Sequence, residues 1–248
     1  ETKIHVLEES DRLKTSILNS VSHELRSPLA AIKASISSLR SGAVSWEHEA
    51  RQELLTTIEE ETDQLNQLVG NLLDMSRIES GSLKPHLRWN SISEIAKSAT
   101  ARMKGQLGEH VLDFDFPENM PLVPSDYVML EQVFINLLSN SAKYAPQKST
   151  IKISAGLEVK VARVFVKNKS PHVNEEDLQN IFDKFHRVTL ADKVIGTGLG
   201  LSICKGIIEA HDGKIWAENI IDGFQFVFTL PLLLNGNPPE IPEEVIDG

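Results

Sequence analysis

Two stretches of helical apolar spacing fill the first third of the chain, and they constrain its fold more than any other feature. Leucine, isoleucine and valine recur every three or four residues from Glu1 to about Leu39 and again from Trp46 to Gly81. Ser41-Gly42 interrupts the pattern, and Gly81 offers a stop at its end. The spacing predicts two long helices joined by a short turn, which is a helical hairpin.

A hairpin of two such helices cannot bury all of its apolar side chains alone. Each helix buries one stripe against the other, and the remaining leucine and isoleucine side chains would face water. A second copy of the hairpin would cover them in a four-helix bundle. We therefore predict a homodimer that is formed by residues 1–84.

The spacing of apolar residues changes after Lys84-Pro85, where patterns typical of strands begin to mix with patterns typical of helices. Because the two do not alternate strictly, we expect an α+β sandwich with one largely antiparallel sheet over residues 85–234. Residues 235–248 hold three prolines and four acidic residues without periodicity, which predicts a loose tail. The expected strands are His86–Trp89, Val111–Phe116, Ile151–Leu157, Val161–Lys167, Lys214–Glu218 and Phe224–Leu230, and the expected helices are Ile92–Gln106, Ser125–Tyr144, Glu175–Phe185 and Leu199–His211.

Composition excludes several classes of protein. The chain has 248 residues, 41% of them hydrophobic, and no apolar run approaches the roughly 18 residues that span a bilayer. Cys204 is the one cysteine, which excludes an intrachain disulfide framework and favours a reducing, cytoplasmic location. A net charge of −10 opposes nucleic acid binding. Because the chain starts at Glu1 without methionine or a signal-peptide pattern, we expect a piece of a longer protein, attached to a membrane only through upstream segments.

The first predicted helix carries a histidine beside a carboxylate. His23 and Glu24 share a polar face, and Pro28 bends the helix one turn later. A neutral imidazole can attack a phosphoryl group through one ring nitrogen while a carboxylate holds the proton on the other. The alternative is a solvated His-Glu pair on an ordinary helix.

A glycine-rich segment, Gly196-Thr197-Gly198-Leu199-Gly200, opens a predicted helix after a polar loop. Glycines let the backbone approach a phosphate chain, and the free N–H groups of a helix N-terminus attract its charge. The spacing matches neither the Rossmann nor the Walker pattern. A nucleotide cradle is therefore one interpretation, and a flexible loop at a helix start is the other.

Two asparagines, Asn136 and Asn140, lie four residues apart on another predicted helix, with Lys143 and Tyr144 one turn on. Amide oxygens can ligate magnesium, a lysine can contact phosphate, and an aromatic ring can cover a base. Asparagine is unfavourable in the interior of a helix, so the presence of two asparagines on one helix face calls for a structural or functional explanation. A surface helix with satisfied polar side chains remains the alternative.

Five motifs in this order resemble the catalytic core of a bacterial sensor histidine kinase, from about Asp11 to Leu232. Within that family, the amino-acid sequences of several segments most resemble the KdpD-type kinases, which are associated with the control of potassium transport. The resemblance implies the histidine kinase/Hsp90-like ATPase fold for the sandwich. The motifs are SVSHELRSPLAAIKAS, LVGNLLDMSRIESG, LEQVFINLLSNSAKYAP, IFDKFHR and GTGLGLSICKGIIEAHDGKIWAEN.

The resemblance also implies roles for single residues. His23 would be the phosphoacceptor, Glu24 its general base or orienting partner, and Ser27 the position that bears on phosphatase activity. Asn140 would ligate Mg²⁺ for ATP. Phe182 and Phe185 would pack a lid over the nucleotide, or simply belong to the core. The implied nucleotide contacts are Asn136, Asn140, Lys143, Tyr144, Asn168, Arg187, Gly196, Thr197, Gly198, Leu199 and Gly200.

One departure from the family concerns the adenine-binding motif Asp-x-Gly-x-Gly. Counting back from Ile181-Phe182 places that motif on Asn168–His172, so asparagine replaces the aspartate and both glycines are lost. The amide carbonyl can still accept a hydrogen bond from the adenine amino group, but a bond to a charged acceptor is about twice as strong.

The motifs together indicate an ATP-dependent histidine autokinase of a two-component system. It would pass the phosphoryl group from His23 to an aspartate of a response regulator, under the control of an upstream sensory domain. One alternative is a kinase-like signalling scaffold with weak or lost nucleotide binding, which Asn168 favours. Another is an ATPase of the chaperone or gyrase type, which would use a glutamate where this chain has Asn136.

The apolar stripes predict that residues 1–84 sediment as a helical dimer. Replacing Leu65 or Leu72 by lysine should weaken the dimer, because a charge would enter the buried stripe. Gln64→Lys, which adds the same charge beside the stripe, is the control. Analytical ultracentrifugation measures the association, and a stable monomer would contradict the bundle.

Overall fold

The computed structural model describes residues 21–22, 24–41, 48–184, 186, 198–234 and 236–237. The chain divides into two compact units, Glu1–Ser76 and Arg77–Gly248. Among the described residues, no helix is both long enough and apolar enough to cross a membrane.

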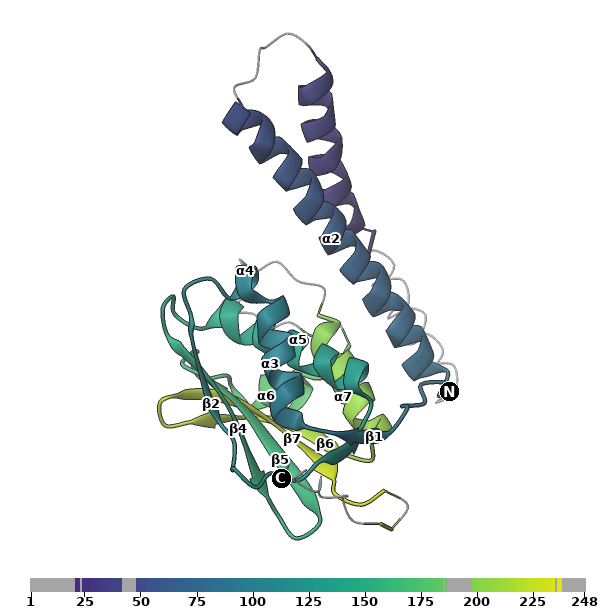
Figure 1. Ribbon diagram of the computed structural model, residues 1–248. Helices are drawn as coiled ribbons and strands as arrows, with labels where there is room; N and C mark the ends of the chain where they lie inside the picture. Colours follow the sequence, from purple (N-terminus) through teal and green to yellow (C-terminus); the bar gives the residue numbers. More distant parts are fainter. Residues whose placement is uncertain are drawn as a thin grey trace, which may run out of the picture. The chain divides into compact units, whose positions relative to one another are not determined.

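The first unit contains the two helices of the predicted hairpin over its described residues, whereas residues 1–20 of the first predicted helix and Gly42 of the predicted turn lie outside them. Residues 24–40 are helical, and α2 (His48–Glu79) follows and lies alongside them in Figure 1. Helix α2 ends where the sequence predicted a stop. Gly81 has φ +64°, Gly81 N–H donates to the Ile78 carbonyl, and Ser82 N–H donates to the Arg77 carbonyl. This left-handed glycine is the usual way to close a helix C-terminus.

The second unit contains a five-stranded sheet in the order β2-β4-β5-β7-β6. Only the β2–β4 pair is parallel, so the sheet is largely antiparallel, as expected. Two short strands, β1 and β3, form a separate antiparallel pair. The strands are β1 (Arg88–Asn90), β2 (Val111–Asp115), β3 (Val123–Ser125), β4 (Thr150–Leu157), β5 (Val161–Asn168), β6 (Lys214–Ile220) and β7 (Gly223–Pro231). The helices are α3 (Ile92–Arg102), α4 (Lys104–Leu107), α5 (Tyr127–Tyr144), α6 (Glu175–Asn180) and α7 (Gly200–Ala210).

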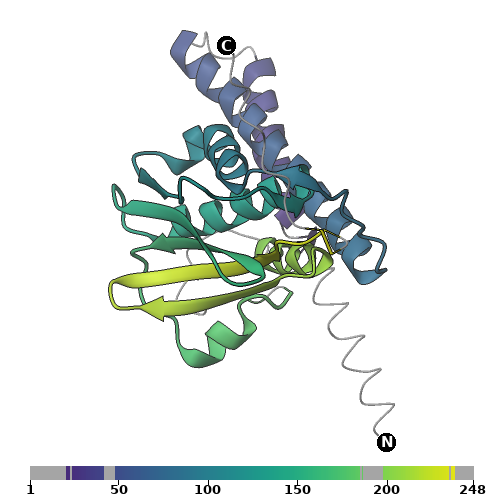
Figure 2. The same cartoon turned by 60° about the horizontal axis from the view of Figure 1, so that its bottom comes forward.

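Helices α3, α5 and α7 cover one face of the sheet (Figures 1 and 2). Strand β5 alternates buried and half-buried residues, and the buried ones Ala162, Val164 and Val166 are fully covered. On α5, the Phe134 ring packs edge-on against Phe228 of β7 at 5.7 Å between centroids. The core of this unit therefore lies between α5 and the middle strands.

The expected strand His86–Trp89 begins two residues later, as β1, and three predicted helices of the second unit also differ from the structure. The helix expected over Ile92–Gln106 is divided at Met103, whose φ of −92° and ψ of 6° are not helical. Ser125, expected to begin a helix, instead ends β3, because Asp126 caps α5 by accepting from two backbone N–H groups. Helix α6 stops at Asn180, short of the predicted Phe185, which lies outside the described residues together with most of the predicted tail.

A buried histidine fastens the start of α5 to the end of α7. The Nε2 atom of His211 accepts a hydrogen bond from Asp126 N–H at 3.0 Å, and Nδ1 lies 2.7 Å from the Ile207 carbonyl. Accepting through Nε2 requires a neutral ring that donates through Nδ1. Burial lowers the pKa of His211, against smaller opposing effects of the Ile207 carbonyl, Asp126 and Asp212.

The lowered pKa of His211 predicts a loss of stability in mild acid. Below about pH 6.5 the unfolded chain takes up a proton that the folded chain resists, so the stabilisation by neutral His211 is present above that pH and declines below it. The difference in melting temperature between the unmodified protein and His211→Gln should shrink by a few degrees when the pH falls from 7.5 to 5.5. Glutamine does not titrate, so only the unmodified protein loses this stabilisation. A constant difference in melting temperature across this range would contradict the assignment.

Candidate functional site

Two predicted nucleotide contacts lie on α5 and are bonded to one another. Asn136 is buried, with 5% of its surface exposed, and its Nδ2 donates to the Gly200 carbonyl at 3.3 Å. Asn140, one turn later, donates from Nδ2 to the Asn136 carbonyl at 2.9 Å. Within the described part of the chain, the Asn140 amide oxygen accepts no hydrogen bond. That oxygen is therefore available to a ligand.

The glycine-rich segment meets α5 at the start of α7. Gly198 has φ +68°, a conformation that glycine adopts without strain, and Leu199 is fully buried beneath the segment. Leu199 supplies no side-chain cap to α7. A Cβ on Gly200 would meet the Asn136 side chain at 3.5 Å. The structure thus brings Gly198, Leu199 and Gly200 together with Asn136, whereas Gly196, Thr197 and Arg187 lie outside the described residues.

Asn168 ends β5 on the side of the sheet that faces the helices, and 4% of it is exposed. Its Nδ2 donates to the Ser141 carbonyl on α5 at 3.3 Å, and its Oδ1 accepts from the Ser170 hydroxyl at 3.3 Å. Sequence reasoning did not single out Ser141 or Ser170 as partners of Asn168. Ser141 directly follows Asn140, and that position is the signal that could have found it.

The loop after Asn168 is held in place, although residues 169–173 include no glycine. His172 Nε2 lies 2.8 Å from the Ile220 carbonyl, and the Asn219 amide bonds both the N–H and the carbonyl of Val173. Gly223 permits the close approach of β7, since a Cβ there would lie 2.1 Å from the Asn168 carbonyl oxygen. The loop is therefore pinned to the end of β6.

The remaining predicted site residues lie at the end of α5, on the helix of the first unit and in the core of the second unit. Lys143 and Tyr144 form the exposed last turn of α5. Glu24 is half-buried and Ser27 is exposed on the helix of the first unit, whereas His23 lies outside the described residues. Phe182 packs edge-on against Phe226 with 6% of its surface exposed, which agrees with the core interpretation.

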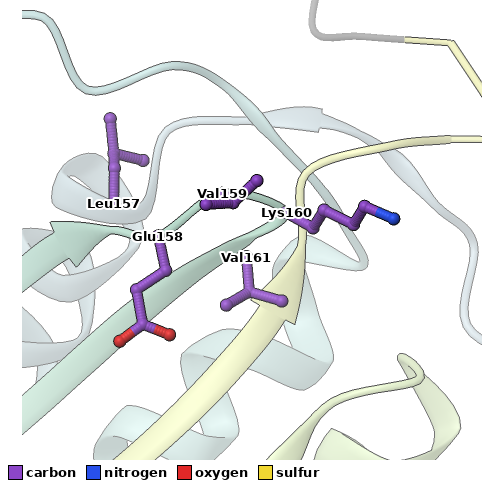
Figure 3. A pocket seen from close by; sticks show the side chains of 5 residues that line it. All are labelled: Leu157, Glu158, Val159, Lys160 and Val161. Carbon is purple, nitrogen blue, oxygen red and sulfur yellow. The ribbon is translucent and has the colours of Figure 1, made fainter.

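Two other features carry no chemistry for this site. The pocket in Figure 3 is lined by Leu157–Val161 of the β4–β5 hairpin alone, and Val159 at its tip is 98% exposed. Cys204 is fully buried, and burial raises the pKa of its thiol to about 12, so the thiol stays protonated.

The residues that are present fit a nucleotide with magnesium. Gly198 and the start of α7, where Leu199 supplies no side-chain cap, suit a phosphate group, and the Asn140 oxygen is a hard ligand for Mg²⁺. No group of three His, Cys, Asp or Glu side chains in the described ranges is arranged to hold a metal ion by itself. A magnesium ion would therefore arrive with phosphate oxygens as its other ligands.

Two family models match the chain. Residues 13–81 match the His Kinase A (phospho-acceptor) domain, which includes His23, and residues 125–234 match the histidine kinase-, DNA gyrase B- and HSP90-like ATPase domain. The second match contains the asparagines of α5, Asn168 and the glycine-rich segment.

Curated relatives and solved structures agree with these matches. The chain is 36% identical over 226 residues to the sensor protein KdpD of Clostridium acetobutylicum, covering 90% of this chain and 25% of the relative. It is 33% identical to KdpD of Escherichia coli, covering 98% and 27%. The chain thus spans about a quarter of the length of these relatives.

Among solved structures, the catalytic domain of histidine kinase ThkA is 30% identical with a TM-score of 0.53, covering 59% of this chain and 97% of that one. ThkA in complex with the response regulator protein TrrA is 26% identical with a TM-score of 0.63, covering 93% and 67%. The phosphoacceptor match, the ATPase match and the ThkA catalytic domain together show that the chain belongs to the sensor histidine kinase family.

Proposed function

We propose that this chain is an ATP-dependent autokinase of a two-component system, which phosphorylates His23 and passes the phosphoryl group to an aspartate of a response regulator. Residues 1–84 would form the dimerisation and phosphotransfer part, residues 85–234 the ATP-binding part and residues 235–248 an acidic tail. The observation that carries the proposal is the contact of Asn136 with Gly200, which joins the asparagine face of α5 to the glycine-rich start of α7.

The nucleotide would lie along this face of α5. Its phosphates would meet the backbone from Gly196 to Gly200, where the α7 N-terminus favours negative charge. The Asn140 oxygen would ligate Mg²⁺, and Lys143 would contact a phosphate. Arg187 and Thr197 would add contacts at the phosphate end, and Tyr144 would flank the base near Asn168.

At the phosphoacceptor, one ring nitrogen of His23 would attack the γ-phosphorus of ATP. The new P–N bond forms as the bond from the γ-phosphorus to the bridging oxygen breaks, and ADP leaves. Glu24 would hold the proton on the other ring nitrogen and balance the positive charge that develops on the imidazole. Ser27, exposed one turn later, would bear on phosphatase activity. Transfer of this kind depends chiefly on positioning and charge neutralisation.

The proposed partners follow from the phosphoryl group and from the relatives. The relative ThkA has been solved with a response regulator, and we propose such a regulator as the acceptor here. A second copy of the chain would complete the bundle, and a sensory domain in the longer protein would control it. This part would lie in the cytoplasm, with any membrane attachment through upstream segments.

Two alternatives receive less support than the kinase. An ATPase that activates water needs a base on α5, but Asn136 presents an amide there and donates it to Gly200. A scaffold without nucleotide binding would not need the left-handed Gly198 or the available oxygen of Asn140.

Replacing His23 by glutamine should abolish autophosphorylation, because glutamine offers no nucleophilic ring nitrogen. Incubation with γ-labelled ATP and Mg²⁺ should give acid-labile, base-stable phosphate in the unmodified protein only. His48→Gln, a histidine at the start of α2, is the matched control and should keep the label. Persistent label on His23→Gln would refute the phosphoacceptor.

Replacing Glu24 by glutamine should slow autophosphorylation about a hundredfold or more if Glu24 acts as the base. Glutamine keeps the size of the side chain and removes the charge. Calorimetric binding of ATP should stay unchanged, which separates chemistry from binding. An unchanged labelling rate would show that Glu24 takes no part in the transfer.

Replacing Gly198 by alanine should weaken MgATP binding about five- to thirtyfold, since a left-handed backbone costs an ordinary residue about 1 to 2 kcal/mol. Gly236→Ala is the control, because Gly236 has φ +82° with nothing near its Cβ and lies outside the glycine-rich segment. Equal nucleotide affinity in both variants, measured by calorimetry, would exclude Gly198 from the cradle.

A further inference from the structure

The polar segment of α5 from Asn136 to Ser141 contacts different elements at its two ends. One end is Asn136, bonded to the first residue of α7, and the other is Ser141, whose carbonyl accepts from Asn168. Five residues separate these ends, which is about 7.5 Å along a helix axis. If phosphates meet the α7 N-terminus, the base of the nucleotide lies toward Ser141 and Asn168.

The hydrogen-bonding groups at this second end are all uncharged, and each can both donate and accept. Asn168 donates one of its two amide hydrogens to Ser141 and accepts one hydrogen bond from Ser170. One N–H and one lone pair of the amide are left over. The Ser141 hydroxyl likewise offers a donor and an acceptor, whereas the Ser170 hydroxyl already donates to Asn168 and offers an acceptor. A carboxylate in place of the amide would offer acceptors only.

Ser141 gives independent evidence that a polar partner is missing here. Its Oγ is completely buried and has no hydrogen-bond partner in the described structure, and the residue is 0% exposed. A buried hydroxyl without a partner is costly, so such groups in folded proteins commonly mark a place for a ligand or ordered water. The same residue provides the carbonyl that orients Asn168.

The Asn168 amide is held in a fixed position, which matters for recognition. Its two partners lie on α5 and in the following loop, and that loop is in turn pinned to β6 through Asn219 and the Ile220 carbonyl. Groups that are already in place lose little freedom when a base binds. The uncharged side chains of Ser141, Asn168 and Ser170 therefore form a preorganised hydrogen-bonding surface for a base.

We propose that this site accepts 6-oxo purine nucleotides as well as 6-amino ones, an inference that rests on the proposed nucleotide binding. The Asn168 oxygen and the serine hydroxyls can accept from the amino group of adenine. The Asn168 N–H and the Ser141 hydroxyl can donate to the carbonyl of hypoxanthine. A carboxylate at this position would face that carbonyl with like partial charge, and it would select adenine.

Calorimetric titration of the full chain with MgADP and MgIDP tests the inference, because adenine and hypoxanthine differ only in the 6-substituent and the proton on N1. Diphosphates avoid turnover during the measurement. The two dissociation constants should agree within about threefold for the unmodified chain. Asn168→Asp should shift the ratio at least tenfold in favour of ADP, since a charged acceptor strengthens the bond to the amino group.

Asn119→Asp is the matched control, because it adds the same charge at an exposed position between β2 and β3. The ratio of the MgIDP and MgADP dissociation constants of this control should equal that of the unmodified chain. A preference of the unmodified chain for ADP of tenfold or more would overturn the specificity inference and leave the proposed kinase standing. Binding of neither nucleotide would overturn both. The ratio in the unmodified chain decides the question even if Asn168→Asp fails to fold.

Discussion

Burial of α5 against the middle of the sheet is the interaction on which the second unit depends. Phe134 and Leu137 are fully buried, and Phe134 meets Phe228 of β7 edge to face. Each such side chain contributes about 1.5 to 3 kcal/mol when it leaves water. Because β5 and β7 are both inner strands of the order β2-β4-β5-β7-β6, each paired on two sides, the helix lies over strands that cannot shift independently.

Fixing the apolar face of α5 also fixes its polar residues. Asn136 is two positions from Phe134 and is itself buried, so its amide must find a partner inside the protein. It finds the Gly200 carbonyl, which couples α5 to the start of α7. At the far end of the same helix, Asp126 and His211 make a second connection to α7. The start of α7 at Gly200 is therefore positioned by α5 rather than by its own sequence.

The sequence predicted more of the elements than of their ends. Helix α2, strands β4 to β7 and helix α7 agree with the expected ranges to within a few residues, because each carries a strong apolar period of its own. The short β3 was missed, since its three residues are a strand only through pairing with β1. The end of α6 was placed too far along, because Phe182 continues the apolar pattern but packs on Phe226 from a turn.

For the site, the sequence alone determined the family and the chemical types of the groups, since a nucleophilic histidine beside a carboxylate and glycines before a helix are local patterns. It also predicted that Asn168 replaces the aspartate of the family's adenine-binding motif. Only the tertiary structure decided what that departure means. The partners of Asn168 are a carbonyl on α5 and a hydroxyl in the next loop, and the buried hydroxyl of Ser141 has no hydrogen-bond partner among the residues that the structure describes. Such contacts join residues distant in the chain, and they exist only after the sheet has buried α5, so no local pattern encodes them.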